Sequence, residues 1–334
     1  MRVFAPGRVN LIGDHTDYTG GLVLPMAIDL GTTVRGERSG DTIVLRSDAR
    51  AGTTEIPIDV AHPASAMPEW SRYVAGVVAE LRPRQGFVGE ITTTLPLGAG
   101  LSSSASLEVA VALAIGDERD PLRLARLCQR AEHRGAGVPC GIMDQLVVAA
   151  AVEEHALLID CHSLARQAVR IPAEVSIYAV PCGEDRQLVG SAYADRRADC
   201  VAAEVIVGPL READVDNVAR ITDDRVRRRA RHVVTENDRV RSFTAAMQCA
   251  DYVRAGALMI ESHRSLRDDF GVSTARLDAL VEQLCATPGV FGARMTGAGF
   301  GGCAVVLADR SAQIVGWHLR PSAGARVAGD SGAW

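Results

Sequence analysis

The sequence contains no lysine, so the 36 positions counted as lysine or arginine are all arginine. This absence excludes mechanisms that need a lysine side chain. P-loop nucleotide-binding proteins hold the terminal phosphates with a lysine, and Schiff-base enzymes use a lysine amine as the nucleophile. Arginine remains available for binding phosphate or carboxylate groups, because its guanidinium stays cationic and presents several donors.

Long apolar runs and a leader-like start are also absent. No apolar stretch reaches the roughly 18 residues that a membrane-spanning helix needs, and Met1 to Ala5 shows no basic segment followed by an apolar one. The eight cysteines stand more than ten residues apart, which fits neither a disulfide framework nor a tetrahedral zinc site. We therefore expect reduced thiols, no membrane partner and a cytoplasmic location.

Charge and composition indicate a globular protein that does not bind nucleic acid. The formal net charge is −5, and acidic and basic residues are mixed along the chain. No basic stripe is therefore present to follow a phosphate backbone. Hydrophobic residues make up 47% and charged residues 23% of the 334 positions, which is enough for two domains with apolar cores. We expect a monomer or a weak dimer.

Apolar periodicity and turn residues divide the chain into strands and helices. Apolar spacing predicts a helix over Trp70–Leu81 that stops before Pro83, and alternation predicts a strand over Gly89–Leu95. The pattern breaks around residues 165–171, where we place the boundary between domains 1–167 and 168–334. Further strands are predicted within Val3–Ile28 and at Thr42–Arg46, His155–Asp160 and Val175–Val180, and further helices at Ser104–Ile115, Leu122–His133, Gly141–Ala151, Tyr193–Val207, Asp224–Ala257 (in pieces) and Thr274–Ala286.

A loop rich in glycine and serine, Pro96–Ser104, joins a predicted strand to a predicted helix. Such a junction presents unpaired backbone N–H groups and the positive end of the helix dipole, which suit a phosphate group. Gly98 and Gly100 allow a ligand to approach the backbone closely, and a serine hydroxyl can bind Mg²⁺. A capped helix with a flexible entry is the structural alternative, and the three consecutive serines favour the phosphate site.

A second glycine-rich loop, Gly297–Gly302, formally contains the G-x-G-x-x-G pattern of dinucleotide-binding folds. In those folds a helix follows the last glycine and holds the pyrophosphate at its N-terminus. Here the apolar run Cys303–Leu307 follows instead, and it predicts a strand. We therefore expect a tight loop between two strands, close to a ligand, rather than a dinucleotide site.

The most polar loop is Gly7–Tyr18, which holds two aspartates, a histidine and a tyrosine within residues 14–18. These side chains offer the mixture of donors and acceptors that a hydroxyl-rich ligand needs. A metal site is less favoured there, because a hard cation requires more oxygen ligands and zinc a different spacing. A surface turn is the structural alternative.

These three loops, in this order, resemble the three motifs of the GHMP kinase superfamily and, within it, the galactokinase family. Gly7–Tyr18, continued by Gly20–Pro25, looks like the galactokinase signature. Leu95–Glu108 is similar to the ATP-phosphate motif, and Met295–Gly302 is similar to the third motif. The resemblance runs from about Ala5 to Leu307, with further matches at Trp70–Tyr73, Gly137–Gln145, His155–Cys161, Gly190–Tyr193, Arg231–Val233 and Ser262–Asp269.

The resemblance implies an α+β, two-domain GHMP kinase fold, with an N-terminal domain like ribosomal protein S5 domain 2 and a C-terminal ferredoxin-like α/β sandwich. It implies a transferase that moves the terminal phosphoryl group of ATP to the anomeric hydroxyl of galactose or a close analogue. ATP and Mg²⁺ are the implied cofactors. Arabinose, an amino sugar or a uronic acid remain alternative acceptors, and a non-catalytic sugar sensor on the same scaffold is an alternative of a different class.

The resemblance also implies roles for individual residues. Arg8 and Asp144 take the catalytic positions beside the anomeric hydroxyl, where Asp144 either accepts the proton or orients the hydroxyl. Ser104 and Glu132 are the implied Mg²⁺ ligands, and Trp70 is implied to lie near adenine. Taken alone, Asp144 is typical of a helix cap, Glu132 of a polar helix position and Trp70 of a core position. The implied sugar site contains Asp14, His15, Asp17, Gly141 and Tyr193, and the implied ATP-phosphate site contains Gly98, Gly100, Leu101, Ser102, Ser103 and Ser104.

One position departs from the family pattern, because galactokinases usually carry glutamate where this chain has Asp14. The shorter side chain withdraws the carboxylate by about 1.5 Å, one C–C bond. In the family this position faces the C4 to C6 side of the sugar. We therefore expect the change to affect sugar specificity more than chemistry, and to favour a sugar that is larger than galactose at C6 or differently substituted there.

Overall fold

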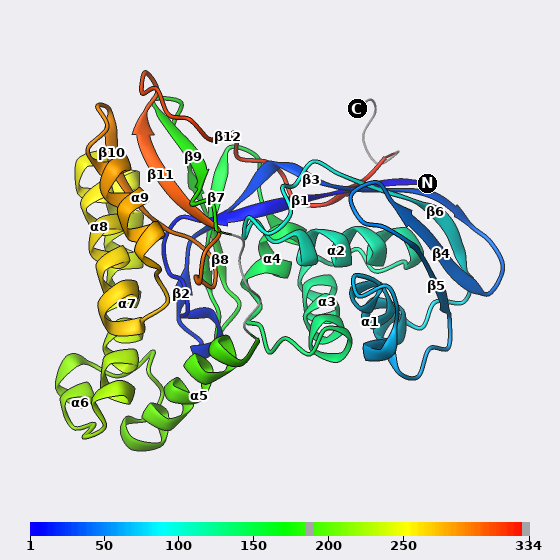
Figure 1. Ribbon diagram of the computed structural model, residues 1–334, viewed down its shortest axis with the longest axis horizontal. Helices are drawn as coiled ribbons and strands as arrows, with labels where there is room; N and C mark the ends of the chain where they lie inside the picture. The colour runs from blue at the N-terminus through cyan, green and yellow to red at the C-terminus, as the bar shows by residue number, and fades with distance from the viewer. Residues whose placement is uncertain (185–189, 329–334) are drawn as a thin grey trace.

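The computed structural model describes residues 1–184 and 190–328 (Figure 1). Residues 185–189 and 329–334, both within the predicted second domain, lie outside the described residues, and the side chains of Gly190 and Ser191 are not described either. A six-stranded sheet has the order β13-β1-β3-β6-β4-β5, in which only β4 and β6 pair in parallel. Its strands are β1 Arg2–Asn10, β3 Pro25–Arg38, β4 Thr42–Ser47, β5 Thr53–Pro57, β6 Phe87–Thr93 and β13 Arg326–Val327.

Four helices cover one face of this sheet (Figure 1). They are α1 Ser71–Leu81, α2 Ser103–Ile115, α3 Pro121–Gly135 and α4 Met143–Ala150. α2 packs on β1 and β3 and is in turn covered by α1 and α3. Because it is surrounded in this way, α2 is buried along most of its length, which explains its run of alanine, valine and leucine.

A four-stranded antiparallel sheet of order β10-β11-β9-β12 lies at the other end of the molecule. α8 and α9 pack against it, and α7 packs against α8. A small sheet of order β2-β7-β8 lies between the two larger ones (Figure 1). The strands are β2 Leu22–Val23, β7 His155–Asp160, β8 Arg166–Arg170, β9 Val175–Pro181, β10 Val290–Met295, β11 Cys303–Asp309 and β12 Trp317–Leu319, and the helices α5 Gly190–Val207, α6 Val215–Ala219, α7 Asp224–Gln248, α8 Tyr252–Ser265 and α9 Ala275–Cys285, with short turns at Asp17–Thr19, Pro63–Ser65 and Leu266–Phe270.

Most predicted elements are confirmed within one to three residues, and the corrections have local causes. The pattern break at residues 165–171 is strand β8, whose pairing with β7 was missed because only Val169 among Arg166–Arg170 is buried. The predicted boundary between residues 167 and 168 therefore lies inside a paired strand, and the two-domain division remains a prediction. The region Asp224–Ala257, predicted to be helical in pieces, consists of two helices, because Ala250 has a positive φ of 57° and Asp251 caps a new helix, and the second helix continues to Ser265. The short elements β5, β12, β13 and α6 were missed.

An apolar cluster joins the two larger sheets. Val9 and Met26, from β1 and β3, belong to the same buried cluster as Ile177 and Val305, from β9 and β11. The polar loop, whose first residues Gly7–Asn10 form the end of β1, therefore starts within the shared core of the two halves. Within the described ranges no helix combines the length and apolar character needed to cross a membrane.

Glycines allow α1 and α3 to approach with their backbones in contact. A Cβ atom at Gly76 of α1 would collide with the carbonyl oxygen of Ala131 in α3, and one at Gly135 of α3 would collide with the carbonyl oxygen of Arg72 in α1. Both obstacles are backbone atoms, which cannot turn aside as a side chain can. The close crossing fixes the last turn of α3, which carries Glu132.

We predict that Gly76→Ala destabilises the protein by about 1–3 kcal/mol, because the added methyl group forces α1 and α3 apart in a packed core. Arg126→Ala, on the exposed side of α3, is the control and should change stability by less than about 0.5 kcal/mol. Urea unfolding followed by circular dichroism measures both free energies. A Gly76→Ala variant as stable as wild type would mean that the two helices do not cross as closely as described.

Candidate active site

The three loops identified in the sequence meet at one pocket of about 640 Å³. The polar loop contacts both of the others. The backbone N–H of Arg8 donates to the carbonyl of Leu101 at 3.1 Å, and the Asp14 carboxylate accepts a hydrogen bond from the N–H of Gly297 at 3.0 Å, across 283 residues of sequence. Every residue that the sequence assigned to the site lines this pocket.

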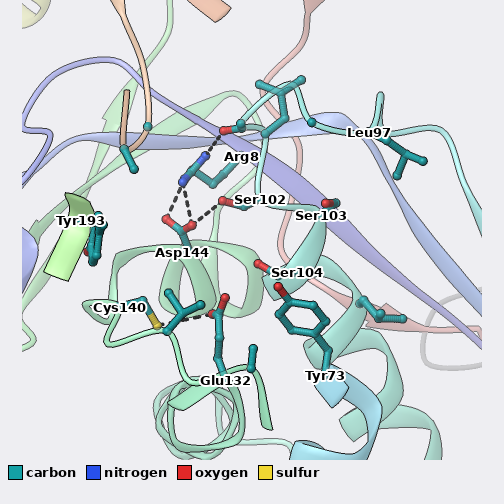
Figure 2. Close-up of a pocket in the computed structure, with 18 of the residues that line it drawn as sticks. Arg8, Tyr73, Leu97, Ser102, Ser103, Ser104, Glu132, Cys140, Asp144 and Tyr193 are labelled. Atoms are coloured by element: carbon teal, nitrogen blue, oxygen red, sulfur yellow. Dashed lines mark hydrogen bonds and ion pairs between the residues drawn. The ribbon is translucent and has the colours of Figure 1, made fainter. Parts of the chain in front are cut away.

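Arg8 and Asp144 form a bidentate ion pair that faces the pocket (Figure 2). Nε and Nη2 of Arg8 donate to Oδ1 and Oδ2 of Asp144 at 2.7 and 2.6 Å. The remaining nitrogen, Nη1, donates to the carbonyl of Gly100 at 2.7 Å, and the Ser102 hydroxyl donates to Oδ2 of Asp144. The side chain of Arg8 is 5% exposed and that of Asp144 is 25% exposed, so the carboxylate is the more accessible member of the pair.

Neither Asp144 nor the serine loop serves as an ordinary helix cap. Asp144 lies in the first turn of α4, but the N-cap is Ile142, and both Asp144 oxygens accept from Arg8 and Ser102 instead. Ser102 is the N-cap of α2, with a positive φ of 56°, and its hydroxyl is directed to Asp144 rather than to the helix. The interpretation of Asp144 as a helix cap is therefore wrong. The N-terminus of α2, where Ser103 and Ser104 line the pocket, keeps N–H groups that have no intrahelical acceptor.

Asp14 is held by contacts on both carboxylate oxygens. Oδ1 accepts from Gly297, and Oδ2 lies 2.7 Å from Nη2 of Arg294, a residue with no exposed surface. The same Nη2 is 3.9 Å from Oε1 of the buried Glu236. The position of the carboxylate is therefore set by Arg294 and a backbone amide as well as by the length of the side chain. Arg294 in β10 and Glu236 in α7 were not predicted as site residues. Nothing in the sequence around either residue indicates that its charge is buried.

Aromatic rings surround His15 at the polar loop. His15 has a φ of 67°, its Nε2 lies 3.2 Å from the carbonyl oxygen of Ala298, and its Nδ1 lies 2.9 Å from the hydroxyl of Tyr18. Because a carbonyl only accepts, Nε2 donates to it and the Tyr18 hydroxyl donates to Nδ1. The rings of Phe270 and Tyr193 lie 4.6 and 5.8 Å from the His15 ring, measured between centroids. The orientation of His15 is thus fixed before any ligand enters.

Asp17 and Gly141 touch within the pocket. A Cβ atom at residue 141 would collide with the Asp17 carboxylate, so a larger residue there would have to displace that side chain. Burial, and to a lesser degree the charge of Asp144, raise the pKa of Asp17 from 3.8 to about 7. A carboxyl group with this pKa changes its charge near neutral pH, and its ability to accept hydrogen bonds changes with it.

Ser104 and Glu132 are the two predicted Mg²⁺ ligands, and Figure 2 shows Glu132 reaching up from α3 towards Ser104. Burial, and then the charge of Asp144, raise the pKa of Glu132 to about 7, while hydrogen bonds from Cys140, Ser104 and Gln145 oppose the rise. A cation beside this buried carboxylate would favour its charged form, and a hydroxyl and a carboxylate are hard donors, so the pair fits Mg²⁺. Within residues 1–184 and 190–328, no group of three or more His, Cys, Asp or Glu side chains is arranged to hold a metal, so water and phosphate oxygens would have to complete the coordination.

The far end of the pocket is formed by α1 and the edge of the first sheet. Trp70 lines it, and its Nε1 donates to the carbonyl of Ala51 at 3.2 Å. The same ring is partly buried against the cluster of the first sheet, and its position near adenine stays a prediction. Tyr73, one helical turn further on, also lines the pocket and was missed, although its spacing from Trp70 places both on one helix face.

We predict that Asp17 makes stability fall as the pH rises. Its folded pKa, about 7, lies above the unfolded value of 3.8, so its contribution is complete below about pH 4 and is lost as the pH rises through 7. Asp17→Asn keeps the neutral form at every pH. Relative to wild type, its free energy of unfolding should therefore rise by about 1–3 kcal/mol between pH 5 and pH 8.

Urea unfolding of both proteins at pH 5, 6, 7 and 8 measures this difference. Asp238→Asn, on the exposed side of α7, is the control, for which the difference from wild type should stay constant over the same range. A difference for Asp17→Asn that is equal at pH 5 and pH 8 would show that Asp17 is already charged at the lower pH.

Comparison with known proteins matches most of the chain to kinases. Residues 1–38 match the galactokinase galactose-binding signature, residues 72–152 the N-terminal domain of GHMP kinases, and residues 243–315 the C-terminal domain of GHMP kinases. Galactokinase from Homo sapiens is 42% identical over 331 residues, covering 93% of this chain and 84% of that protein. Galactokinase from Chloroflexus aggregans is 40% identical over 347 residues, covering 95% and 87%.

Solved structures give the same result for the fold. The structure of Lactococcus lactis galactokinase complexed with galactose superposes with a TM-score of 0.90 and 31% identity, covering 97% of this chain and 94% of that one. Mevalonate kinase from Methanococcus jannaschii superposes with a TM-score of 0.69 and 20% identity, covering 96% and 98%, which shows a shared fold alone. The α+β GHMP kinase fold is therefore confirmed. Strand β11 after the Gly297 loop confirms that this loop joins two strands.

Proposed function

The chain belongs to the galactokinase family of GHMP kinases, and we propose that it transfers the γ-phosphoryl group of ATP to the anomeric hydroxyl of galactose. One observation carries the proposal: the serine loop, which suits a phosphate group, and the polar loop, which aromatic rings surround, meet at the Arg8–Asp144 pair. An acceptor hydroxyl placed at this pair would lie next to both the sugar side and the nucleotide side of the pocket. This is the arrangement that in-line phosphoryl transfer needs.

Asp144 acts on the acceptor. The anomeric oxygen attacks the γ-phosphorus, the bond from that phosphorus to the bridging oxygen breaks, ADP leaves, and the hydroxyl proton passes to the Asp144 carboxylate. Because Oδ1 and Oδ2 already accept hydrogen bonds from Arg8 and Ser102, the carboxylate is rigidly oriented. Positioning the hydroxyl therefore contributes to the rate alongside proton acceptance.

Arg8 and the serine loop act on the phosphates. Arg8 is a permanent cation whose guanidinium is held in place by Asp144 and the carbonyl of Gly100. It stabilises negative charge that develops on the transferred group. The free N–H groups at the start of α2 and the positive end of its dipole bind phosphate oxygens. We assign this binding to Gly98, Gly100, Leu101, Ser102, Ser103 and Ser104, and the adenine end to Trp70.

The sugar lies on the side of the pocket formed by the polar loop and α5. Asp14, His15, Asp17, Gly141 and Tyr193 line that side and provide carboxylates, a ring nitrogen and a phenol, which suit a ligand covered with hydroxyl groups. The complex of Lactococcus lactis galactokinase with galactose supports galactose as the acceptor here. Asp14 is held by Arg294 and takes the family position that faces the C4 to C6 side of the sugar. We therefore expect preference among sugars to differ on that side from relatives that carry glutamate.

Mg²⁺ bound by Ser104 and Glu132 would neutralise charge on the ATP phosphates. The two side chains come from α2 and α3 and line the same pocket. In the proposed reaction, Ser104 and Glu132 hold the cation at a fixed position next to the serine loop.

The alternative functions receive less support. Acceptors such as arabinose, an amino sugar or a uronic acid are not favoured, because the relatives that match across the chain are galactokinases. A sensor without catalysis is not favoured either, since Arg8, Asp144 and the serine loop are intact and in contact.

We place the protein in the cytoplasm as a monomer or weak dimer. The location is supported by its eight cysteines, all of which are free thiols in the structure, as in proteins of reducing compartments. The oligomeric state stays a prediction from the sequence.

A sugar panel tests the proposal. Purified protein with ATP and Mg²⁺ is assayed for ADP release with galactose, 6-deoxygalactose, glucose, arabinose, galactosamine and galacturonic acid, and the product is examined by ³¹P NMR. We expect galactose to have the highest kcat/KM and the phosphate to be bonded to C1. An equal or higher kcat/KM for another sugar would overturn the choice of acceptor, and ATP turnover at background with every sugar would favour the sensor.

A further inference from the structure

Three side chains behind Glu132 form a hydrogen-bonded group that the proposed reaction does not use. The Nε2 atom of Gln145, next to Asp144 on α4, donates to Oε2 of Glu132 at 2.5 Å and to Oε2 of Glu108 at 3.2 Å. The Cys140 thiol donates to the same Oε2 of Glu132 at 3.4 Å. Gln145 and Glu108 have no exposed surface and lie behind the pocket wall, whereas Cys140 lines the pocket.

The two carboxylates determine which way the Gln145 amide points. An amide has a donor end and an acceptor end, and the donor end of Gln145 faces Oε2 of both Glu108 and Glu132. A flipped amide would place its oxygen against Oε2 of Glu132, and beside a bound cation, where that carboxylate is charged, the two oxygens would repel. Glu108 therefore fixes the amide, and the amide in turn engages one oxygen of Glu132.

Stability alone does not explain this arrangement. Oε1 of Gln145 and Oε1 of Glu108 are buried with no hydrogen-bond partner within the described part of the chain. A buried polar atom left unpaired costs about 1–3 kcal/mol, and the surrounding α2 and α4 are largely apolar. An apolar residue at position 145 would avoid that cost, so the amide has a use other than packing.

We propose that Gln145 is a positioning residue for the Mg²⁺ ligand Glu132: together with Cys140 it occupies Oε2, so that the carboxylate presents Oε1 to the cation in a fixed orientation. Glu108 supports it by holding the amide. The proposal rests on the proposed function, because it takes Glu132 as a ligand. Partners of this kind behind metal ligands typically contribute about 10- to 100-fold to metal affinity.

Binding of Mn²⁺ in place of Mg²⁺ tests the proposal without measuring turnover. Free Mn²⁺ is titrated by electron paramagnetic resonance against the protein with a saturating non-hydrolysable ATP analogue. Gln145→Leu, which keeps the approximate volume and removes the donor, should weaken Mn²⁺ binding by about 10- to 100-fold. Affinity for the analogue measured in EDTA should stay near that of wild type.

Two matched variants separate positioning from general damage. Gln129→Leu removes another carboxamide, one that donates to the backbone carbonyl of Cys140 at 3.2 Å, and it should leave Mn²⁺ affinity unchanged. Glu108→Gln keeps an acceptor oxygen for Gln145 and should bind Mn²⁺ nearly as wild type does, whereas Glu108→Leu should lose affinity as Gln145→Leu does. If Gln145→Leu does not fold, the comparison of Glu108→Gln with Glu108→Leu tests the positioning role in its place.

Glu132→Gln shows whether the inference or the underlying function fails. If Glu132→Gln loses Mn²⁺ binding while Gln145→Leu, or Glu108→Leu in its place, retains wild-type affinity, the positioning role is wrong and the metal site stands. If Glu132→Gln binds Mn²⁺ as tightly as wild type does, Glu132 is not a ligand, and this part of the proposed function fails together with the inference.

Discussion

The ion pair between Arg8 and Asp144 is the interaction on which the rest of the pocket depends. It joins the end of β1 to the start of α4, across 136 residues of sequence. Burying two charges is costly unless each keeps its hydrogen bonds. Here the carbonyl of Gly100 accepts from Arg8, and the hydroxyl of Ser102 donates to Asp144. The serine loop is thus attached to both members of the pair, so the loop that would hold phosphate and the group that would orient the acceptor cannot move independently.

Small residues and an irregular strand make this contact possible. The register between β1 and β3 shifts between Pro6 and Arg8, and such irregularities often re-aim a side chain next to an active site. A Cβ atom at Gly7 would lie 2.7 Å from the carbonyl oxygen of Leu101 and would also collide with Leu95. Glycine at this position therefore allows β1 to lie against the serine loop, and Arg8 reaches Asp144 from there.

The sequence predicted the parts of this protein that rest on local pattern or on family motifs. Strands and helices with clear periodicity, such as His155–Asp160 and α9, were predicted within a residue, and the motif residues line one pocket. Strand β8 could not be found, because a strand with one buried residue has no alternating pattern. Arg294 and Glu236 could not be found, and Glu108 and Gln145, although they lie in matched segments, were given no role, because the importance of all four comes from burial and partners that lie far away in the chain.

The account's central claim is that Arg8 and Asp144 act as one unit, and a double-mutant cycle tests it most directly. Single-turnover phosphorylation rates are measured for wild type, Arg8→Met, Asp144→Asn and the double variant. Each single change should slow the reaction by about 100-fold or more. If the pair acts as a unit, the double variant should be no slower than the slower single variant. Losses that multiply in the double variant would contradict the account, because they would show that the two residues contribute independently.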